Sequence, residues 1–115
     1  MKLFIIIKLF AFCFFSFAET SVCKNSPVVL NSKNDWEKYK IFEWNNCYGE
    51  LKQNYKNKKK WNSHFKNGLP NGYGTVRYEN LNGYFQGYFK DGKMDGVGKY
   101  VNKKGKNFIV YCEKN

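Results

Sequence analysis

The sequence has few of the side chains on which most catalytic and metal sites depend. His64 is the only histidine and Arg77 the only arginine among 115 residues. A metal site needs clustered ligands, which one histidine and scattered cysteines do not supply. The scarcity of arginine argues against a surface that reads phosphates, because the planar fork of Arg binds phosphate oxygens in pairs. We therefore expect no cofactor, no metal and no nucleic-acid partner.

Acidic residues are also few, and the first 18 residues have a distinct composition. The chain has 20 basic and 9 acidic residues. Lys2 and Lys8 precede an uncharged apolar run, and Ser16-Phe17-Ala18 follows it, which is the layout of a secretory signal. The run is shorter than the roughly 18 residues that span a bilayer. We predict a cleaved signal peptide at residues 1–18 and a protein exported to the periplasm or secreted; an uncleaved anchor is the alternative.

Cysteine usage is consistent with export. Cys13 lies in the predicted leader, which leaves Cys23, Cys47 and Cys112. An oxidising compartment would allow one disulfide and one remaining thiol, with three pairings to choose from. We favour Cys23 with Cys47, because this bond would tie the N-terminal segment to the rest of the domain and add about 3 kcal/mol of stability. Three reduced, packed cysteines are the alternative, and the role of Cys112 stays open.

Glycine divides the chain into two regions, since none of the ten glycines precedes Gly49. Residues 19–43 show no clear period, and we expect an irregular segment there with a short helix from Asp35 to Phe42. Asn34 or Asp35 could cap that helix.

Residues 44–112 contain an internal repeat. A shift of 24 residues places one set of aromatic and glycine positions on a second set, and such self-similarity marks a repeat architecture. Partial units precede and follow the two full ones: Asn46–Gly49 matches Asn71–Gly74, and Phe108 matches Phe85. The repeat-defining residues are Trp61, Phe65, Gly68, Gly72 and Gly74 in the first unit and Phe85, Gly87, Phe89, Gly92, Gly96 and Gly98 in the second.

Each unit has the pattern of a β-hairpin. Phe85, Gly87 and Phe89 occupy alternate positions and share one face of a strand, and Asp91-Gly92 supplies a turn. A glycine between two aromatic residues leaves room for a ring to lie against the backbone. We predict an all-β fold of tandem antiparallel hairpins, with Trp61, Phe65, Phe85, Phe89 and Tyr100 in its core. If one face of the sheet is open, such rings could instead hold a sugar or a peptide.

This spacing resembles that of MORN-repeat proteins. The second unit has every fixed position of their pattern, and the first departs once, with Ser63 in place of glycine. Trp44 to Gly49 is similar to the opening of exported bacterial MORN arrays, in which a cysteine commonly takes the first glycine position and another precedes it. The resemblance supports the Cys23–Cys47 pairing and implies an elongated hairpin sheet that serves as a scaffold. It also implies protein or phospholipid binding, and no enzyme activity.

Two connections depart from the family pattern, and we expect both to be irregular. Residues 50–60 lack the usual turn glycine, and the connection from Val76 to Gly83 is two residues longer than its counterpart. The first contains a basic run next to a tryptophan: Lys56, Lys58, Lys59, Lys60 and Trp61. Lysines beside Trp suit an anionic membrane surface, although a charged loop also keeps a sheet edge from pairing with other chains.

No catalytic centre can be identified. Ser63 and His64 are sequence neighbours, so on a strand their side chains would face opposite sides and could not act as a nucleophile and base. The glycine pairs Gly72/Gly74 and Gly96/Gly98 do not continue into a phosphate-binding loop. The sequence thus favours a non-enzymatic scaffold that binds an unknown protein partner. The alternative is a peripheral binder of anionic phospholipid.

Overall fold

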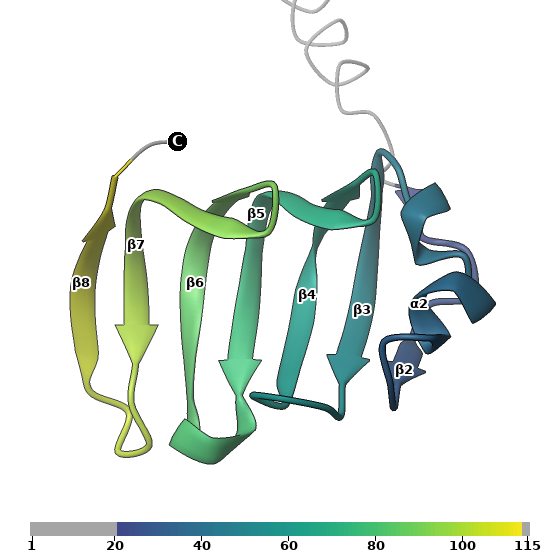
Figure 1. Cartoon of the computed structure of the whole chain (residues 1–115). Coiled ribbons are helices and arrows are strands. Elements are labelled where there is room, and N and C mark those ends of the chain that lie inside the picture. The colour runs from purple at the N-terminus through teal and green to yellow at the C-terminus, as the bar shows by residue number, and fades with distance from the viewer. Residues whose placement is uncertain (1–20, 114–115) are drawn as a thin grey trace, which may run out of the picture.

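The computed structural model describes residues 21–113, most of which form one curved β-sheet (Figure 1). The strands occur in the order β1-β3-β4-β5-β6-β7-β8, and β2 pairs with β3 beside this path. All pairs from β3 to β8 are antiparallel, which confirms the predicted all-β hairpin fold. The elements are β1 (Ser21–Val22), β2 (Val28–Leu30), α2 (Asp35–Lys38), η1 (Ile41–Glu43), β3 (Cys47–Gln53), β4 (Lys59–Lys66), β5 (Leu69–Tyr78), η2 (Glu79–Leu81), β6 (Gly83–Lys90), β7 (Lys93–Val101) and β8 (Asn107–Cys112).

Two-residue turns close the two full hairpins. Asn67 and Gly68 join β4 to β5 with φ of 52° and 81°, and Asp91 and Gly92 join β6 to β7 with φ of 50° and 82°. Two successive left-handed residues form the type I′ turn, whose twist matches that of the flanking strands. The predicted Asp91-Gly92 turn is therefore confirmed, and the 24-residue shift brings the same turn into both units.

The connections from β3 to β4 and from β5 to β6 are irregular, as predicted. The connection from β3 to β4 contains Lys56 and Lys58 with positive φ, and the one from β5 to β6 contains η2 followed by left-handed Asn82. The Glu79 N–H donates a hydrogen bond of 3.1 Å to the carbonyl of Lys58. The two connections are thus held together at one end of the sheet.

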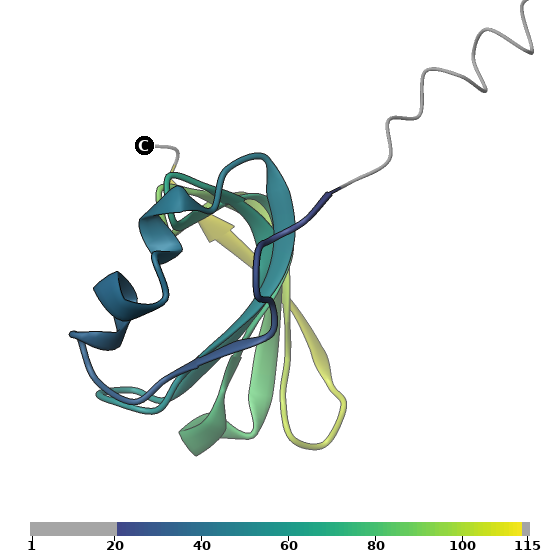
Figure 2. The same ribbon diagram turned by 90° about the vertical axis from the view of Figure 1, so that its right-hand side faces the viewer.

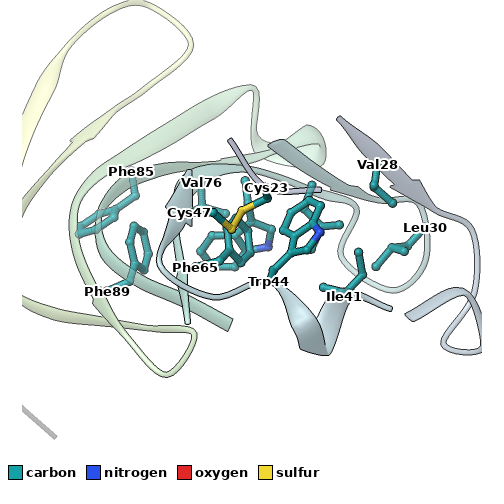
Figure 3. Close-up of a cluster of buried hydrophobic side chains, with 12 residues drawn as sticks. Cys23, Val28, Leu30, Ile41, Trp44, Cys47, Phe65, Val76, Phe85 and Phe89 are labelled. Carbon is teal, nitrogen blue, oxygen red and sulfur yellow. A yellow bond between two sulfur atoms is a disulfide. The ribbon is translucent and has the colours of Figure 1, made fainter. Parts of the chain in front are cut away.

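Alternation along the strands separates an inner, packed face from an outer face. In β6, Phe85, Gly87 and Phe89 are buried on the inner face, as predicted. Trp61, Phe65 and Val76 lie on the same face and belong to the buried cluster, while Tyr100 is half-buried (Figure 3). The inner face therefore holds the core.

The N-terminal segment is more ordered than its sequence suggests. β1 and β2 pair with β3 in parallel over two and three residues, lengths too short to show a period in a sequence. The helical part is also divided: α2 ends at Lys38, left-handed Lys40 follows, and η1 begins at Ile41. Asn34 is the residue before α2 but makes no side-chain cap, and Asp35 Oδ2 instead accepts the Asn31 N–H at 2.8 Å.

This segment lies on the inner side of the sheet (Figure 2), at the end where β3 lies (Figure 1). Trp44 is buried and its ring meets that of Phe65 edge-on at 4.9 Å between centroids. The indole N–H of Trp44 donates to the carbonyl of Lys24 at 2.8 Å. The Cys23–Cys47 disulfide, with a Cα–Cα distance of 4.9 Å, joins the segment to the start of β3 and confirms the predicted pairing. Cys112 is a free, half-buried cysteine on β8.

Candidate functional site

The outer face of the sheet is the candidate binding surface. Figure 2 shows α2 and η1 on the inner side, and within residues 21–113 no helix or strand lies over the outer side. Residues that point outward from β3 to β8 therefore reach solvent unless their own neighbours cover them. Their identities decide what this face can bind.

A row of mostly aromatic side chains crosses the outer face from β3 to β8, and we call it the outer belt. Two pairs of neighbouring members touch: Tyr48 and His64 meet edge-on at 5.3 Å between ring centroids, and Tyr73 and Tyr88 at 5.2 Å. Val97 lies opposite Tyr111 in the pairing of β7 and β8. The belt consists of Tyr48, His64, Tyr73, Tyr88, Val97 and Tyr111, whose exposed fractions, apart from half-buried His64, run from 39% at Tyr48 to 70% at Tyr111.

The repeat itself generates the outer belt. Tyr73 stands between Gly72 and Gly74, and the 24-residue shift places Val97 in the same position of the second unit. His64 corresponds in the same way to Tyr88. Because side chains alternate across a strand, residues next to the inward-facing ring and glycine positions must face outward, and every unit adds two members to the belt.

A broad hollow lies at the C-terminal end of the outer belt. It encloses about 950 Å³ and is lined by Tyr88 and Tyr111 together with Asn71, Asp91 and Asp95. Asp95 lies opposite Tyr88 in the register of β6 and β7. Its Oδ1 atom is buried and has no hydrogen-bond partner among the residues that the structure describes. A buried carboxylate oxygen is costly without a donor, and a ligand with an N–H or O–H group could supply one if the Asp95 side chain turned toward the hollow.

The residues predicted to contact an anionic surface do not lie together, because they are distributed over both faces of the sheet. Lys56, Lys58 and Lys60 are exposed, but Trp61 is buried at 6% on the inner face. Lys59 also points inward and lies over the Trp61 ring at 5.9 Å. Trp61 is therefore part of the core and does not reach a surface together with Lys60.

Lysine 60 and its cross-strand neighbours form a second, basic region of the outer face. The register places Lys60 opposite Lys52 on β3 and opposite Arg77 on β5. Glu50 pairs with Lys60 at 2.6 Å, and Arg77 packs over the Tyr84 ring at 4.9 Å. Of Lys52, Lys60 and Arg77, only Lys60 was predicted to contact an anionic surface. The other two could not be predicted, because the register that aligns the three cations depends on the irregular β3–β4 connection.

Ser63 and His64 are not arranged as a nucleophile and base. Ser63 is fully buried, and its hydroxyl donates to the backbone carbonyl of His64 at 3.0 Å. Within residues 21–113 no three His, Cys, Asp or Glu side chains gather where they could hold a metal ion. The same part of the chain has no helix long and apolar enough to cross a membrane.

Sequence reasoning predicted the inner aromatic stripe but missed the outer belt and Asp95. The signal was present in the residues that alternate with the stripe, where Tyr48, Tyr73 and Tyr88 recur beside the glycines. Such residues could have been assigned to an exposed face once the hairpin pattern was established. The missing hydrogen-bond donor of Asp95 could not have been predicted, because it depends on the packing around one oxygen atom.

Comparison with protein families supports the predicted internal repeat. A family model described as the MORN repeat matches residues 62–82 and 85–106. The two matches fall on the two full 24-residue units, each containing one closed hairpin. No curated protein and no solved structure matched the chain. The chain therefore carries two matches to the MORN repeat, in the hairpins β4–β5 and β6–β7.

Proposed function

We propose that this chain is an exported MORN-repeat scaffold, of the type found in bacteria, that binds a protein partner through the outer belt. The observation that carries the proposal is the belt itself, a row of side chains across six adjacent strands in which four exposed tyrosines predominate. Tyrosine is enriched at protein interfaces because its ring buries apolar area while its hydroxyl keeps a polar contact. The inner face is occupied by the core, which leaves the outer face for a partner.

The hollow beside the belt narrows the chemistry of the partner. Asp95 Oδ1 lacks a donor within the described part of the chain, and a backbone N–H or a donor side chain of the partner would supply one once the Asp95 side chain turned toward the hollow. Tyr88 and Tyr111 flank this position and would exclude water from the new hydrogen bond. A partner segment with one donor between apolar side chains fits the belt and the hollow together.

Export is part of the proposal. The leader predicted at residues 1–18 lies outside the described residues, so its support is its sequence layout. The Cys23–Cys47 disulfide is compatible with an oxidising compartment. Glu19 is then the first residue of the mature protein, whose charge follows from the loss of Lys2 and Lys8: 20 − 2 = 18 basic against 9 acidic residues.

We further infer a binding role without catalysis. The hydroxyl of Ser63, the residue before His64, is engaged with a backbone carbonyl. The side chains of the outer belt are tyrosines, one histidine and one valine, and these suit contact better than acid–base chemistry.

Site-specific photocrosslinking in the native cell would test the docking surface. A photoreactive phenylalanine at Tyr73 or Tyr88 should form a specific adduct with the partner. The matched control is Leu81, which is 61% exposed but lies in η2, away from the belt. Adducts of equal yield at Leu81, or none at either belt position, would contradict the proposal.

Serine variants provide the second arm of this test. Tyr73→Ser and Tyr88→Ser should lose the partner in a pull-down while their unfolding free energy stays within about 0.5 kcal/mol of the parent. Leu81→Ser should retain the partner. If both serine variants retain it, the belt is not the docking surface.

An anionic phospholipid surface is the second candidate, supported by the exposure of Lys56, Lys58 and Lys60 at one end of the sheet. Because Trp61 is buried, such a contact would depend on charge alone, at about 1 kcal/mol per lysine. Co-sedimentation with anionic vesicles should then disappear when Lys56, Lys58, Lys59 and Lys60 are changed to glutamine. Unchanged co-sedimentation would exclude this candidate.

A further inference from the structure

A basic hollow lies where β3 and β5 end and β4 begins, at the end of the sheet closed by the two irregular connections. It encloses about 260 Å³, whereas a water molecule occupies about 30 Å³ in the liquid, so it has room for a compact ligand. Five cationic side chains line it, and Glu79 is the only acidic side chain among its lining residues. The cations are Lys52, Lys58, Lys59, Lys60 and Arg77.

The arrangement of these cations is unfavourable without a ligand. Lys52, Lys60 and Arg77 lie directly opposite one another on three adjacent strands, which are about 4.8 Å apart. Like charges that face each other across strands destabilise a sheet. Glu50 neutralises Lys60, but within residues 21–113 neither Lys52 nor Arg77 forms an ion pair. A bound anion would relieve this repulsion.

The backbone around the hollow holds its rim in place. Glu79 donates its N–H to the carbonyl of Lys58, which links the β3–β4 connection to η2. Asn82 closes η2 in a left-handed conformation, and it lines the hollow with Glu79. The guanidinium of Arg77 is positioned by the ring of Tyr84 beneath it. The cations therefore project from a connected frame and not from separate loops.

We propose that the basic hollow is a binding site for a phosphate group, with Lys52, Lys60 and Arg77 as its principal ligands. A phosphate carries up to two negative charges, which suits several convergent cations. The planar fork of Arg77 can bind two phosphate oxygens at once. The phosphate could be that of a soluble phosphate ester or of a lipid headgroup, and the chemistry of recognition is the same.

The site is separate from the outer belt, so it does not depend on the protein-docking function proposed above, whereas it shares Lys58, Lys59 and Lys60 with the phospholipid contact given there as the second candidate. Lys60 and His64 are four residues apart on β4, which corresponds to about 13 Å along a strand. A partner on the belt and a phosphate in the hollow could therefore bind to one molecule.

Thermal unfolding of the full chain in sodium phosphate, with sodium chloride at equal ionic strength as reference, tests the site. The phosphate-dependent rise in Tm should be lost in the Lys52→Gln/Arg77→Gln double variant, with phosphate binding weakened about tenfold or more. Without phosphate, the same variant should melt at or above the parent temperature, because the repulsion has been removed.

The control carries the same change of charge at a distant place. Lys103 and Lys104 lie in the connection between β7 and β8, and Lys103→Gln/Lys104→Gln should keep the full phosphate-dependent rise. This control also accounts for the general stabilisation of proteins by phosphate salts. The proposal is wrong if the Lys52→Gln/Arg77→Gln variant keeps the rise, or if both double variants lose it to the same extent.

Glycerol phosphate and vesicles of phosphatidylglycerol distinguish the two sources of the phosphate. Sedimentation of the chain with the vesicles, lost in Lys52→Gln/Arg77→Gln and competed by glycerol phosphate, would identify a lipid headgroup. Binding of glycerol phosphate without sedimentation would identify a soluble ester. Failure of both probes to bind would overturn the proposal, and neither result affects crosslinking at Tyr73 or Tyr88.

Discussion

The Gly98→Ala substitution would place a methyl group in space that the Phe85 ring already occupies. An ideal Cβ at Gly98 lies 2.3 Å from Cζ of Phe85 and 3.0 Å from the carbonyl oxygen of Gln86. Ordinary van der Waals contact begins at 3.4 Å, so the ring would have to retreat by at least 3.4 − 2.3 = 1.1 Å. The cost of the substitution depends on whether the neighbouring side chains leave space for the Phe85 ring to move.

The ring of Phe85 is enclosed on its other sides. It is 3% exposed, and it meets the Phe89 ring at 5.6 Å between centroids. Gly87 borders it closely, since an ideal Cβ there would lie only 3.1 Å from the ring. Overpacking a core lowers the free energy of unfolding by about 1–3 kcal/mol. Replacing a strand glycine by alanine raises it by about 0.5–1 kcal/mol. Because the ring is enclosed, we expect the clash to prevail, with a net loss of about 2 kcal/mol.

Urea denaturation followed by tryptophan fluorescence would measure this loss, and the melting temperature should fall by about 8–16 °C for a domain of this size. Val97→Ala is the matched control, because Val97 is the adjacent residue but is 59% exposed on the outer face. Its cost should stay within about 0.5 kcal/mol. In a Phe85→Leu background, Gly98→Ala should cost less, since the two sites share one contact. Equal costs in both backgrounds, or no cost in the parent, would refute the packing argument.

The remaining predictions concern the disulfide, one tyrosine and the leader. Changing Cys23 and Cys47 together to alanine should lower the free energy of unfolding by about 3 kcal/mol, whereas Cys112→Ser should leave it nearly unchanged; equal losses in denaturation curves would contradict this. Burial raises the pKa of Tyr78, so the unfolded state loses that proton first, and stability should fall as pH rises through the unfolded value of about 10. Tyr78→Phe should have a shallower fall in unfolding free energy over this range, and an unchanged slope would exclude the effect. Mass spectrometry of the exported protein should find Glu19 at its N-terminus, and an intact Met1 would disprove cleavage.

The hairpins could be predicted from the sequence because their determinants are local. Asn67-Gly68 and Asp91-Gly92 specify the turns through two successive left-handed residues, and alternation along Phe85 to Phe89 specifies the buried face. The shift of 24 residues then carries both features from one unit to the next. None of these inferences needs information on residues distant in the sequence.

The covering of the inner face could not be predicted in the same way. β1 and β2 contribute two and three residues to the sheet, and their pairing with β3 depends on tertiary contacts. Ile41 is fully buried there although it belongs to no periodic pattern. A short segment that packs through a few large side chains has no local signature.

The basic hollow shows a further limit, which is register. Lys52, Lys60 and Arg77 meet only because β4 begins at Lys59 and pairs with both neighbours in a particular alignment. The connection before β4 has no turn glycine to define that alignment. In a strand, a shift of one residue sends each side chain to the other face, so the hollow could not be assigned until the register was known.

The two full repeats keep aromatic rings at their buried strand positions and differ in character on the outer face, and this contrast separates packing from recognition. Phe65 and Phe89 are identical and buried, because a change there would disturb the core. On the outer face Tyr73 corresponds to Val97, at exposures of 46% and 59%, where packing imposes little constraint. Each unit therefore keeps its fold while presenting its own outward side chains. A partner bound to the outer face would meet a sequence of different contacts along the array, so its position and direction on the sheet would be defined by the residues in which the repeats differ.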